Sequence, residues 1–212
     1  MMRKHSLFAL IIVICHVHRA EAITGDEIII RAQKAFEKAT ALSASFQQTF
    51  TWKLAGRRQQ SNGTILIKKP GMLRLETDQQ IIVSDGMTSW TYSPEHHQVI
   101  IAPYRESDAT FSPKAFLLEY SVNYQTDYIG EESVKRRPCY VVKLTAKGEE
   151  EDITEIKAWV DKRQWVTRKV EYTDVSGNVS SYIISRVKIN PKFEPSTFRF
   201  DIPKGAEVVD MR

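Results

Sequence analysis

The chain has 212 residues, a formal net charge of +4, and a composition that is 42% hydrophobic and 26% charged. This length and balance are typical of one globular domain, and they exclude a collagen-like, low-complexity or long disordered chain. The small net charge does not indicate nucleic-acid binding.

The first 22 residues have the pattern of a secretory signal peptide. A basic start precedes an apolar run over residues 7–15, which is too short for a bilayer that takes about 20 residues. Residues 20–22 read Ala-Glu-Ala, a small-x-small cleavage signal. We therefore expect an exported protein, with cleavage after Ala22 and a single mature domain over 23–212. Cleavage removes three basic residues and one acidic residue, which lowers the net charge from +4 to +2.

The mature chain begins with a helical pattern. Thr24 and Glu27 fit a capping box, and apolar residues follow at helical spacing, which predicts an amphipathic helix over about 25–41. Ser112 and Pro113 fit the N-cap and first position of a second, short helix over about 113–119.

Beyond residue 43 the hydrophobic period changes to two, and turn residues such as Pro70 and Gly71 recur at close spacing. Eleven or twelve short strands of this kind predict an antiparallel barrel or sandwich. The predicted strands span about 44–54, 60–69, 71–77, 80–84, 88–92, 98–103, 124–129, 138–145, 154–160, 165–173 and 179–189, with a final extended piece at 198–202.

The residues that usually carry catalysis or bind metal are scarce. After cleavage only two histidines remain, His96 and His97, and as neighbours in a turn they point apart. Cys139 lies in an apolar strand, where a buried thiol is expected. The chain has no G-x-S-x-G elbow and no G-x-G loop. We therefore expect no metal, no cofactor and no catalytic residue, and a binding protein rather than an enzyme.

Apolar side chains alternate along one face of several predicted strands. If the sheet curls and helices cover its concave face, the space between is filled either by side chains or by the hydrocarbon of a ligand. Periodicity alone favours the filled core. The candidate residues for a ligand site are Phe46, Phe50, Ile65, Ile67, Leu73, Leu75, Trp90 and Tyr92.

Four ordered segments resemble the periplasmic outer-membrane lipoprotein carrier family, LolA. The amphipathic helix leads into Ser-Phe-Gln-Gln at 45–48. Three longer segments follow: GTILIKKPGMLRL at 63–75, IVSDGMTSWTYSP at 82–94 and FRFDIPKGAEVVD at 198–210. Each segment is weak alone, but their order and spacing match the family over nearly the whole mature chain.

The resemblance implies an unclosed antiparallel β-barrel of about eleven strands under a helical lid, with a cavity for the acyl chains of lipoproteins. It also implies three partners: acylated lipoproteins, an inner-membrane ABC-type release complex and an outer-membrane lipoprotein receptor. We expect a monomer that binds no nucleic acid. The lid would present Ile28, Ile29, Phe36, Phe116, Leu117 and Leu118.

One departure from the family pattern concerns the latch. The family carries an arginine just before a proline, which hydrogen-bonds lid carbonyls and holds the empty carrier closed. The matching residue here is Lys69, which keeps the charge but lacks the planar fork of donors. The resemblance therefore implies a lid latch at Lys69 that is weaker or differently made.

Three other functions stay open at the level of the sequence. The same curved sheet could serve a periplasmic lipid- or glycolipid-binding module, such as a sensor or a lipid exporter. A hydrolase or isomerase would need a polar cluster, for which His96 and His97 are the available histidines. A structural β-domain would fill its core completely.

Overall fold

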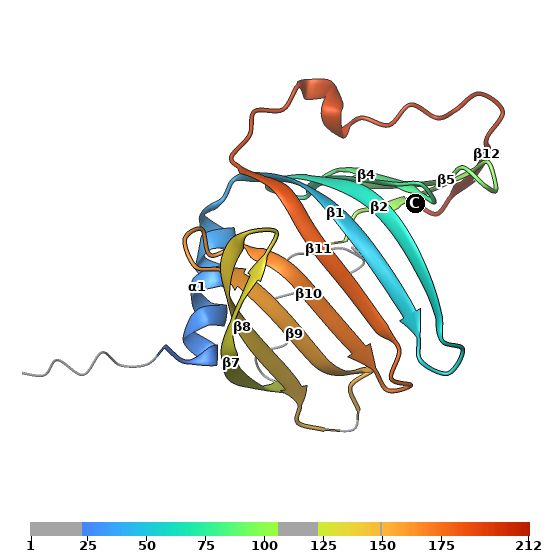
Figure 1. Cartoon of the computed structure of the whole chain (residues 1–212). Coiled ribbons are helices and arrows are strands. Elements are labelled where there is room, and N and C mark those ends of the chain that lie inside the picture. Colours follow the sequence, from blue (N-terminus) through green and yellow to red (C-terminus); the bar gives the residue numbers. More distant parts are fainter. Residues whose placement is uncertain (1–22, 106–122, 149) are drawn as a thin grey trace, which may run out of the picture.

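The computed structural model describes residues 23–105, 123–148 and 150–212. Twelve strands form one unclosed sheet in the order β12-β6-β5-β4-β3-β2-β1-β11-β10-β9-β8-β7 (Figure 1). The predicted unclosed barrel is confirmed, with twelve strands in place of about eleven. The strands are β1 (Ala41–Trp52), β2 (Arg57–Lys68), β3 (Met72–Thr77), β4 (Ile81–Asp85), β5 (Thr88–Ser93), β6 (Gln98–Pro103), β7 (Tyr124–Val134), β8 (Arg137–Ala146), β9 (Ile153–Asp161), β10 (Thr167–Asp174), β11 (Val179–Ile189) and β12 (Glu207–Asp210).

Helix α1 (Gly25–Lys38) begins where the capping box predicts. The Thr24 side chain accepts a hydrogen bond from the backbone N–H of Glu27 at 3.2 Å, which satisfies one of the free donors of the first turn. The helix ends three residues earlier than expected, because Ala39 is already extended. Among the described residues α1 is the one α-helix. The second predicted helix, with Phe116, Leu117 and Leu118, lies outside the described residues, as does the predicted signal peptide.

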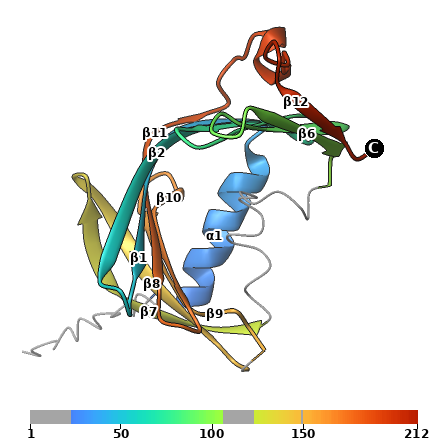
Figure 2. The ribbon, with the colours of Figure 1, turned by 90° about the vertical axis from the view of Figure 1, so that its right-hand side faces the viewer.

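Helix α1 lies inside the curve of the sheet, on its concave side (Figure 2). Its apolar side chains Ile28, Ile29 and Ala32 are buried against strands β7 to β10. Gly25 allows this close approach, since a Cβ there would lie 3.0 Å from backbone atoms of β7. The sheet residues of this core are Tyr124, Val142, Leu144, Ile156, Ala158, Val160, Val170 and Tyr172.

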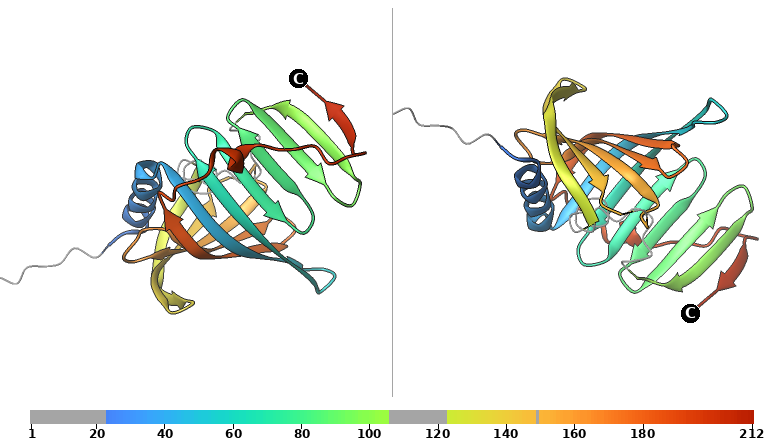
Figure 3. Two further views of the ribbon diagram at one scale, coloured as in Figure 1. Left: turned by 90° about the horizontal axis from the view of Figure 1, so that it is seen from above. Right: turned by 90° about the horizontal axis from the view of Figure 1, so that it is seen from below.

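The C-terminal segment crosses the outer, convex face of the sheet before it forms β12 (Figure 3). Arg74 donates hydrogen bonds to the carbonyls of Thr197 and Arg199, each at 3.3 Å, and Phe198 of the 3-10 turn η2 (Pro195–Phe198) is buried. The last strand therefore lies at Glu207–Asp210, parallel to β6, and not at 198–202 as expected. Residues 198–202 pack on the face of the sheet and not at its edge, so their backbone does not pair with a strand.

Gly63 in β2 lies directly opposite Phe46 in β1, and the aromatic ring covers it. A Cβ on Gly63 would come within 2.4 Å of the ring, so the missing side chain provides the space for Phe46. The position of Phe46 on the concave face thus depends on a glycine in the neighbouring strand.

We expect Gly63→Ala to lower the free energy of unfolding by about 1–3 kcal/mol, the usual cost of overpacking. Gly148→Ala is the matched control, because a Cβ there meets no atom within 4 Å. Urea denaturation of both variants measures the difference. Equal midpoints for the two variants would contradict this account of Phe46.

Candidate functional site

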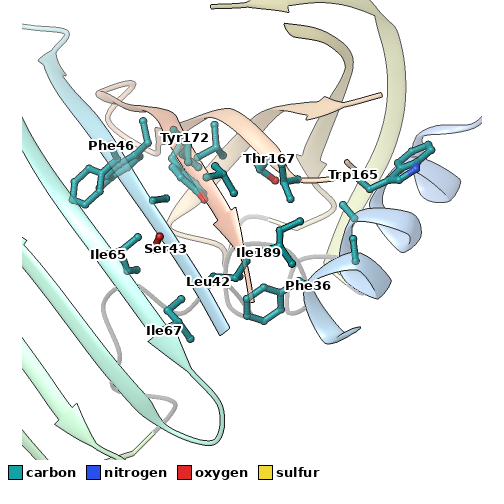
Figure 4. Close-up of a pocket in the computed structure, with 18 residues that line it drawn as sticks. Phe36, Leu42, Ser43, Phe46, Ile65, Ile67, Trp165, Thr167, Tyr172 and Ile189 are labelled. Carbon is teal, nitrogen blue, oxygen red and sulfur yellow. The ribbon is translucent and has the colours of Figure 1, made fainter. Parts of the chain in front are cut away.

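An apolar cavity of about 150 Å³ lies between the C-terminal half of α1 and strands β1, β2, β10 and β11 (Figure 4). Its walls are almost entirely hydrocarbon. The lining residues are Ala32, Ala35, Phe36, Leu42, Ser43, Ala44, Phe46, Ile65, Ile67, Trp165, Val166, Thr167, Val170, Tyr172, Tyr182, Ile184, Val187 and Ile189. Such a cavity can hold a hydrocarbon group without losing hydrogen bonds.

One wall follows from the alternation of strand side chains. Leu42, Ala44 and Phe46 have the same parity in β1 and point to the same face. Ile67 and Ile65 lie directly opposite Leu42 and Ala44 in β2, so they point to this face as well. The pairing register thus gathers five apolar side chains in one patch.

A β-bulge builds the opposite wall. Between the pairs Ser43–Lys188 and Ser45–Ser185, strand β11 has one residue more than β1, and Arg186 there has a φ of 51°. The extra residue shifts the alternation, so that Ile184 before the bulge and Val187 after it both line the cavity. Without the bulge these two residues would point to opposite faces.

The turn between β9 and β10 closes one end of the cavity. Trp165 has a φ of 56°, a left-handed conformation that a bulky residue rarely adopts. Its ring stacks on Tyr140, with centroids 5.6 Å apart, and the Arg31 guanidinium of α1 lies 4.9 Å from the indole. These contacts join the turn to both the sheet and the helix.

Asp161 holds this turn in place. Its carboxylate accepts hydrogen bonds from the N–H groups of Arg163 and Gln164, at 2.9 and 3.0 Å, and forms a buried ion pair with Arg168. Burial alone would raise the pKa of the Asp161 carboxyl, but the two N–H groups and the guanidinium together hold that pKa below its ordinary value.

Lys69 fastens the C-terminal end of α1. Its Nζ donates hydrogen bonds to the carbonyls of Phe36, at 2.7 Å, and Glu37, at 3.2 Å, and lies 4.3 Å from the centre of the Phe36 ring. A cation at these carbonyls also faces the negative end of the helix dipole. The contact is therefore of the kind that the sequence analysis expected, made by a lysine.

A few polar groups border the cavity. The Tyr182 hydroxyl accepts a hydrogen bond from Gln48 at 2.9 Å, and burial raises the pKa of this tyrosine above its ordinary value. The buried hydroxyl of Thr167 has no hydrogen-bond partner within the described ranges. A bound molecule could therefore place one polar group at Thr167.

The structure brings together only some of the predicted site residues. Phe36, Phe46, Ile65 and Ile67 line the cavity. Leu73 and Leu75 are buried on the same face one strand further, opposite Ile67 and Ile65, and are not part of the lining. Phe50 also has the parity of Phe46, but it lies nearer the far end of β1, against Trp52.

The placement of Trp90 and Tyr92 on this face was wrong. Trp90 pairs with Val83, which pairs with Arg74, so all three point to the convex face. Tyr92 follows at the same parity and contacts Phe200 of the C-terminal segment, with centroids 6.1 Å apart. These aromatic rings pack beneath the chain that crosses the outer face.

The predicted lid residues also separate. Ile28 and Ile29 belong to the filled core against β7 to β10, while Phe36 borders the cavity. The sequence analysis missed the wall formed by β10 and β11, although the alternation of Val170 with Tyr172 and of Tyr182 with Ile184 could have indicated it.

Comparison with known proteins decides the family. The model of the family described as outer membrane lipoprotein carrier protein LolA matches residues 37–201. The chain belongs to the LolA family. An outer-membrane lipoprotein carrier protein of Histophilus somni is 28% identical over 193 residues, which cover 90% of this chain and 91% of that relative.

Two uncharacterized proteins are also similar to this chain. An uncharacterized protein of Methanocaldococcus jannaschii is 26% identical over 89% of this chain, which spans about half (55%) of that relative's length. The crystal structure of an uncharacterized conserved protein from Thermus thermophilus has a TM-score of 0.58 and 15% identity, covering 87% of this chain and 98% of that one. That structural match shows a shared fold.

The described residues contain neither a metal-binding cluster nor a membrane-spanning helix. No group of three histidine, cysteine, aspartate or glutamate side chains lies close enough there to hold a metal ion. No helix within these residues has the length and apolar character needed to cross a membrane.

Asp161 gives a test of how the turn supports the cavity. The carboxyl has a lower pKa in the folded protein than in the unfolded chain, where it is about 3.9, so its contribution to stability is complete above that pH and is lost as the pH falls below it. We expect Asp161→Asn to cost about 3–5 kcal/mol at neutral pH and to flatten part of the acid dependence. Urea denaturation at several pH values measures both effects.

Asp78→Asn, at an exposed turn, is the control and should leave the unfolding midpoint unchanged. An Asp161→Asn variant with wild-type stability would show that the buried pair is not needed for the turn.

Proposed function

We propose that the protein is a periplasmic carrier that binds the acyl chains of lipoproteins in the cavity under α1. The observation that carries this proposal is an apolar cavity on the concave face of a LolA-family sheet, walled on one side by the C-terminal half of α1. The names of the curated relatives support lipoproteins as the cargo. The role requires no catalytic residue.

The cavity must enlarge to take its cargo. At about 150 Å³ it resembles cavities that hold a benzene-sized molecule, whereas pockets for larger ligands measure about 300–1,000 Å³. Each buried methylene contributes about 0.8 kcal/mol, so a long acyl chain can offset the cost of separating α1 from the sheet. The small volume supports the interpretation of this conformation as the closed, empty state of the proposed carrier.

The fastening at Lys69 is suited to control this opening. The part of α1 that borders the cavity is its C-terminal half, and Lys69 holds the last carbonyls of that half. The N-terminal half is packed into the core. We propose that cargo moves the C-terminal half of α1 and that Lys69 is the latch of the closed state.

The proposed route follows from the family and the expected export. An inner-membrane ABC-type release complex would load the carrier, and an outer-membrane lipoprotein receptor would unload it. Because the cavity and the latch belong to one chain, a monomer is sufficient. A free lipid or glycolipid is the competing cargo, and mass spectrometry of gently purified protein separates the two.

We expect Ile67→Gln to weaken the binding of a fluorescent acylated peptide about tenfold or more, because it places an amide in the apolar wall. The control is Leu66→Gln, one residue earlier in β2, whose side chain points to the convex face opposite Arg74. It should bind the probe like the wild type. Equal loss in both variants would point to general destabilisation of β2.

We expect Lys69→Met to tighten binding of the same probe by about three- to tenfold. The methionine keeps the packing on Phe36 but removes the two hydrogen bonds that favour the closed state. Amide hydrogen exchange in the last turn of α1 should become faster. Lys69→Arg, which restores charged donors, should return both measurements toward the wild type. Unchanged affinity in Lys69→Met would exclude the latch.

A further inference from the structure

The hairpin formed by β1 and β2 projects beyond its neighbours at one end of the sheet (Figures 1 and 3). Strand β3 pairs with β2 only from Gly63 onward, so residues 57–62 extend past the end of β3. On the other side, the last pair with β11 is Thr51–Val179, and the turn 53–56 lies beyond it. Residues 53–62 form the tip of this hairpin, which thus reaches past the neighbouring strands.

The tip combines an exposed apolar side chain with positive charges. Leu54 is 96% exposed, which no packing role explains. Lys53, Arg57 and Arg58 flank it and are exposed. Within the described residues, Arg57 and Arg58 have no acidic partner in an ion pair. Among the residues that the structure describes, two guanidinium groups without an ion-pair partner therefore lie near the exposed Leu54 side chain.

A second loop lies against this tip. The backbone N–H of Lys53 donates a hydrogen bond to Asn178 at 3.1 Å, and the Lys53 stem lies where a side chain on Gly177 would be. This contact places the β10–β11 turn, with Val175 65% exposed, next to the hairpin. Further up β1, Phe50 and Trp52 contact edge to face, with centroids 4.5 Å apart. The exposed side chains Leu54 and Val175 thus belong to two turns that are in contact, and the Phe50–Trp52 pair lies in the adjoining part of β1.

Acidic side chains at this end lie in the turns on both sides of the hairpin, Asp174 in the β10–β11 turn and Asp78 in the β3–β4 turn, and in the β8–β9 loop. Asp152 and Glu151 lie in the β8–β9 loop, where the Asp152 carbonyl accepts a hydrogen bond from Val175 and the Glu151 carboxylate accepts one from Asn123. The strand order places this loop beyond the β10–β11 turn, on the side away from β1 and β2. The hairpin end itself, residues 53–62, carries Lys53, Arg57 and Arg58 and no acidic residue.

We propose that the β1–β2 tip docks this protein on the surface of a membrane that contains anionic phospholipid. Leu54 enters the boundary between headgroups and acyl chains, and Lys53, Arg57 and Arg58 bind the phosphate groups around it. An exposed apolar residue with flanking cations is the pattern by which peripheral proteins bind such surfaces.

A lipid surface fits the tip better than a protein surface does. The tip is convex and narrow, and protein interfaces normally bury about 800 Å² on each partner. A single inserted side chain with mobile cations needs no shaped partner. This inference does not depend on the cargo, because docking is measured with empty protein and vesicles.

The test is co-sedimentation of the mature protein with vesicles of phosphatidylcholine mixed with phosphatidylglycerol, and with vesicles of phosphatidylcholine alone. We expect binding to the mixed vesicles that weakens as salt is raised. The double variant Arg57→Gln/Arg58→Gln should bind about tenfold to thirtyfold more weakly, since each cation near an anionic surface contributes about 1 kcal/mol. Leu54→Ser should weaken binding about tenfold.

The β7–β8 hairpin supplies a matched control. Its turn carries Lys135 and Arg136, which are also exposed and consecutive, at the opposite end of the sheet and with no exposed large apolar residue in the turn. Lys135→Gln/Arg136→Gln removes the same charge and should leave binding unchanged. Urea denaturation confirms that all variants fold.

Three outcomes would overturn the proposal. The first is that the wild-type protein does not bind mixed vesicles. Binding to an acidic protein surface without binding to vesicles would count as this outcome. The second is equal weakening by the two double variants, which would indicate attraction by net charge. The third is that the double variant at Arg57 and Arg58 self-associates while its vesicle binding is unchanged. The two arginines would then serve to prevent strand pairing at the edge of β2 that extends past β3.

Discussion

The packing of α1 on half of a curved sheet determines the rest of the architecture. An unclosed sheet of this size has an apolar concave face that water must not reach, and a helix of fourteen residues covers only part of it. The first turns of α1 close the core against β7 to β10 through the buried side chains of Ile28, Ile29 and Ala32. The remaining turns extend over β1, β2, β10 and β11, where the side chains leave a cavity.

This arrangement gives the two halves of one helix different properties. The N-terminal half is held by buried apolar contacts and by the close approach at Gly25. The C-terminal half is held by contacts that can be exchanged one at a time, the Lys69 hydrogen bonds and the packing of Phe36. The weaker half is the one that borders the cavity, so a ligand bound there would act on the part of the helix that needs the least free energy to move.

Local chemistry was enough to predict much of the fold. The capping box at Thr24, the change of period after residue 43 and the turn residues located the helix and most strands. Alternation within a strand also placed Phe46, Ile65 and Ile67 together correctly. It failed at Trp90 and Tyr92, because the convex face of β5 is covered by the C-terminal segment and is therefore apolar too. When both faces of a strand are covered, apolar residues occur on both, and their alternation does not indicate which face is concave.

The remaining parts of the site depend on long-range geometry. Trp165 enters the wall through a left-handed turn held by Asp161, and neither the turn conformation nor the stacking on Tyr140 follows from residue types. The family resemblance, rather than periodicity, indicated Lys69, and the structure places its ammonium group on the helix carbonyls. Contacts of this kind connect residues that are distant in the sequence, so only the folded chain reveals them.

The bulge at Arg186 divides β11 into two segments whose side chains alternate out of phase. Before it, even-numbered residues such as Tyr182 and Ile184 face the cavity, and after it the odd-numbered Val187 and Ile189 do. The chain length of this strand is therefore as strictly constrained as its hydrophobicity. Loss of a single residue here would turn one segment of the wall toward solvent, although every apolar residue would still be present.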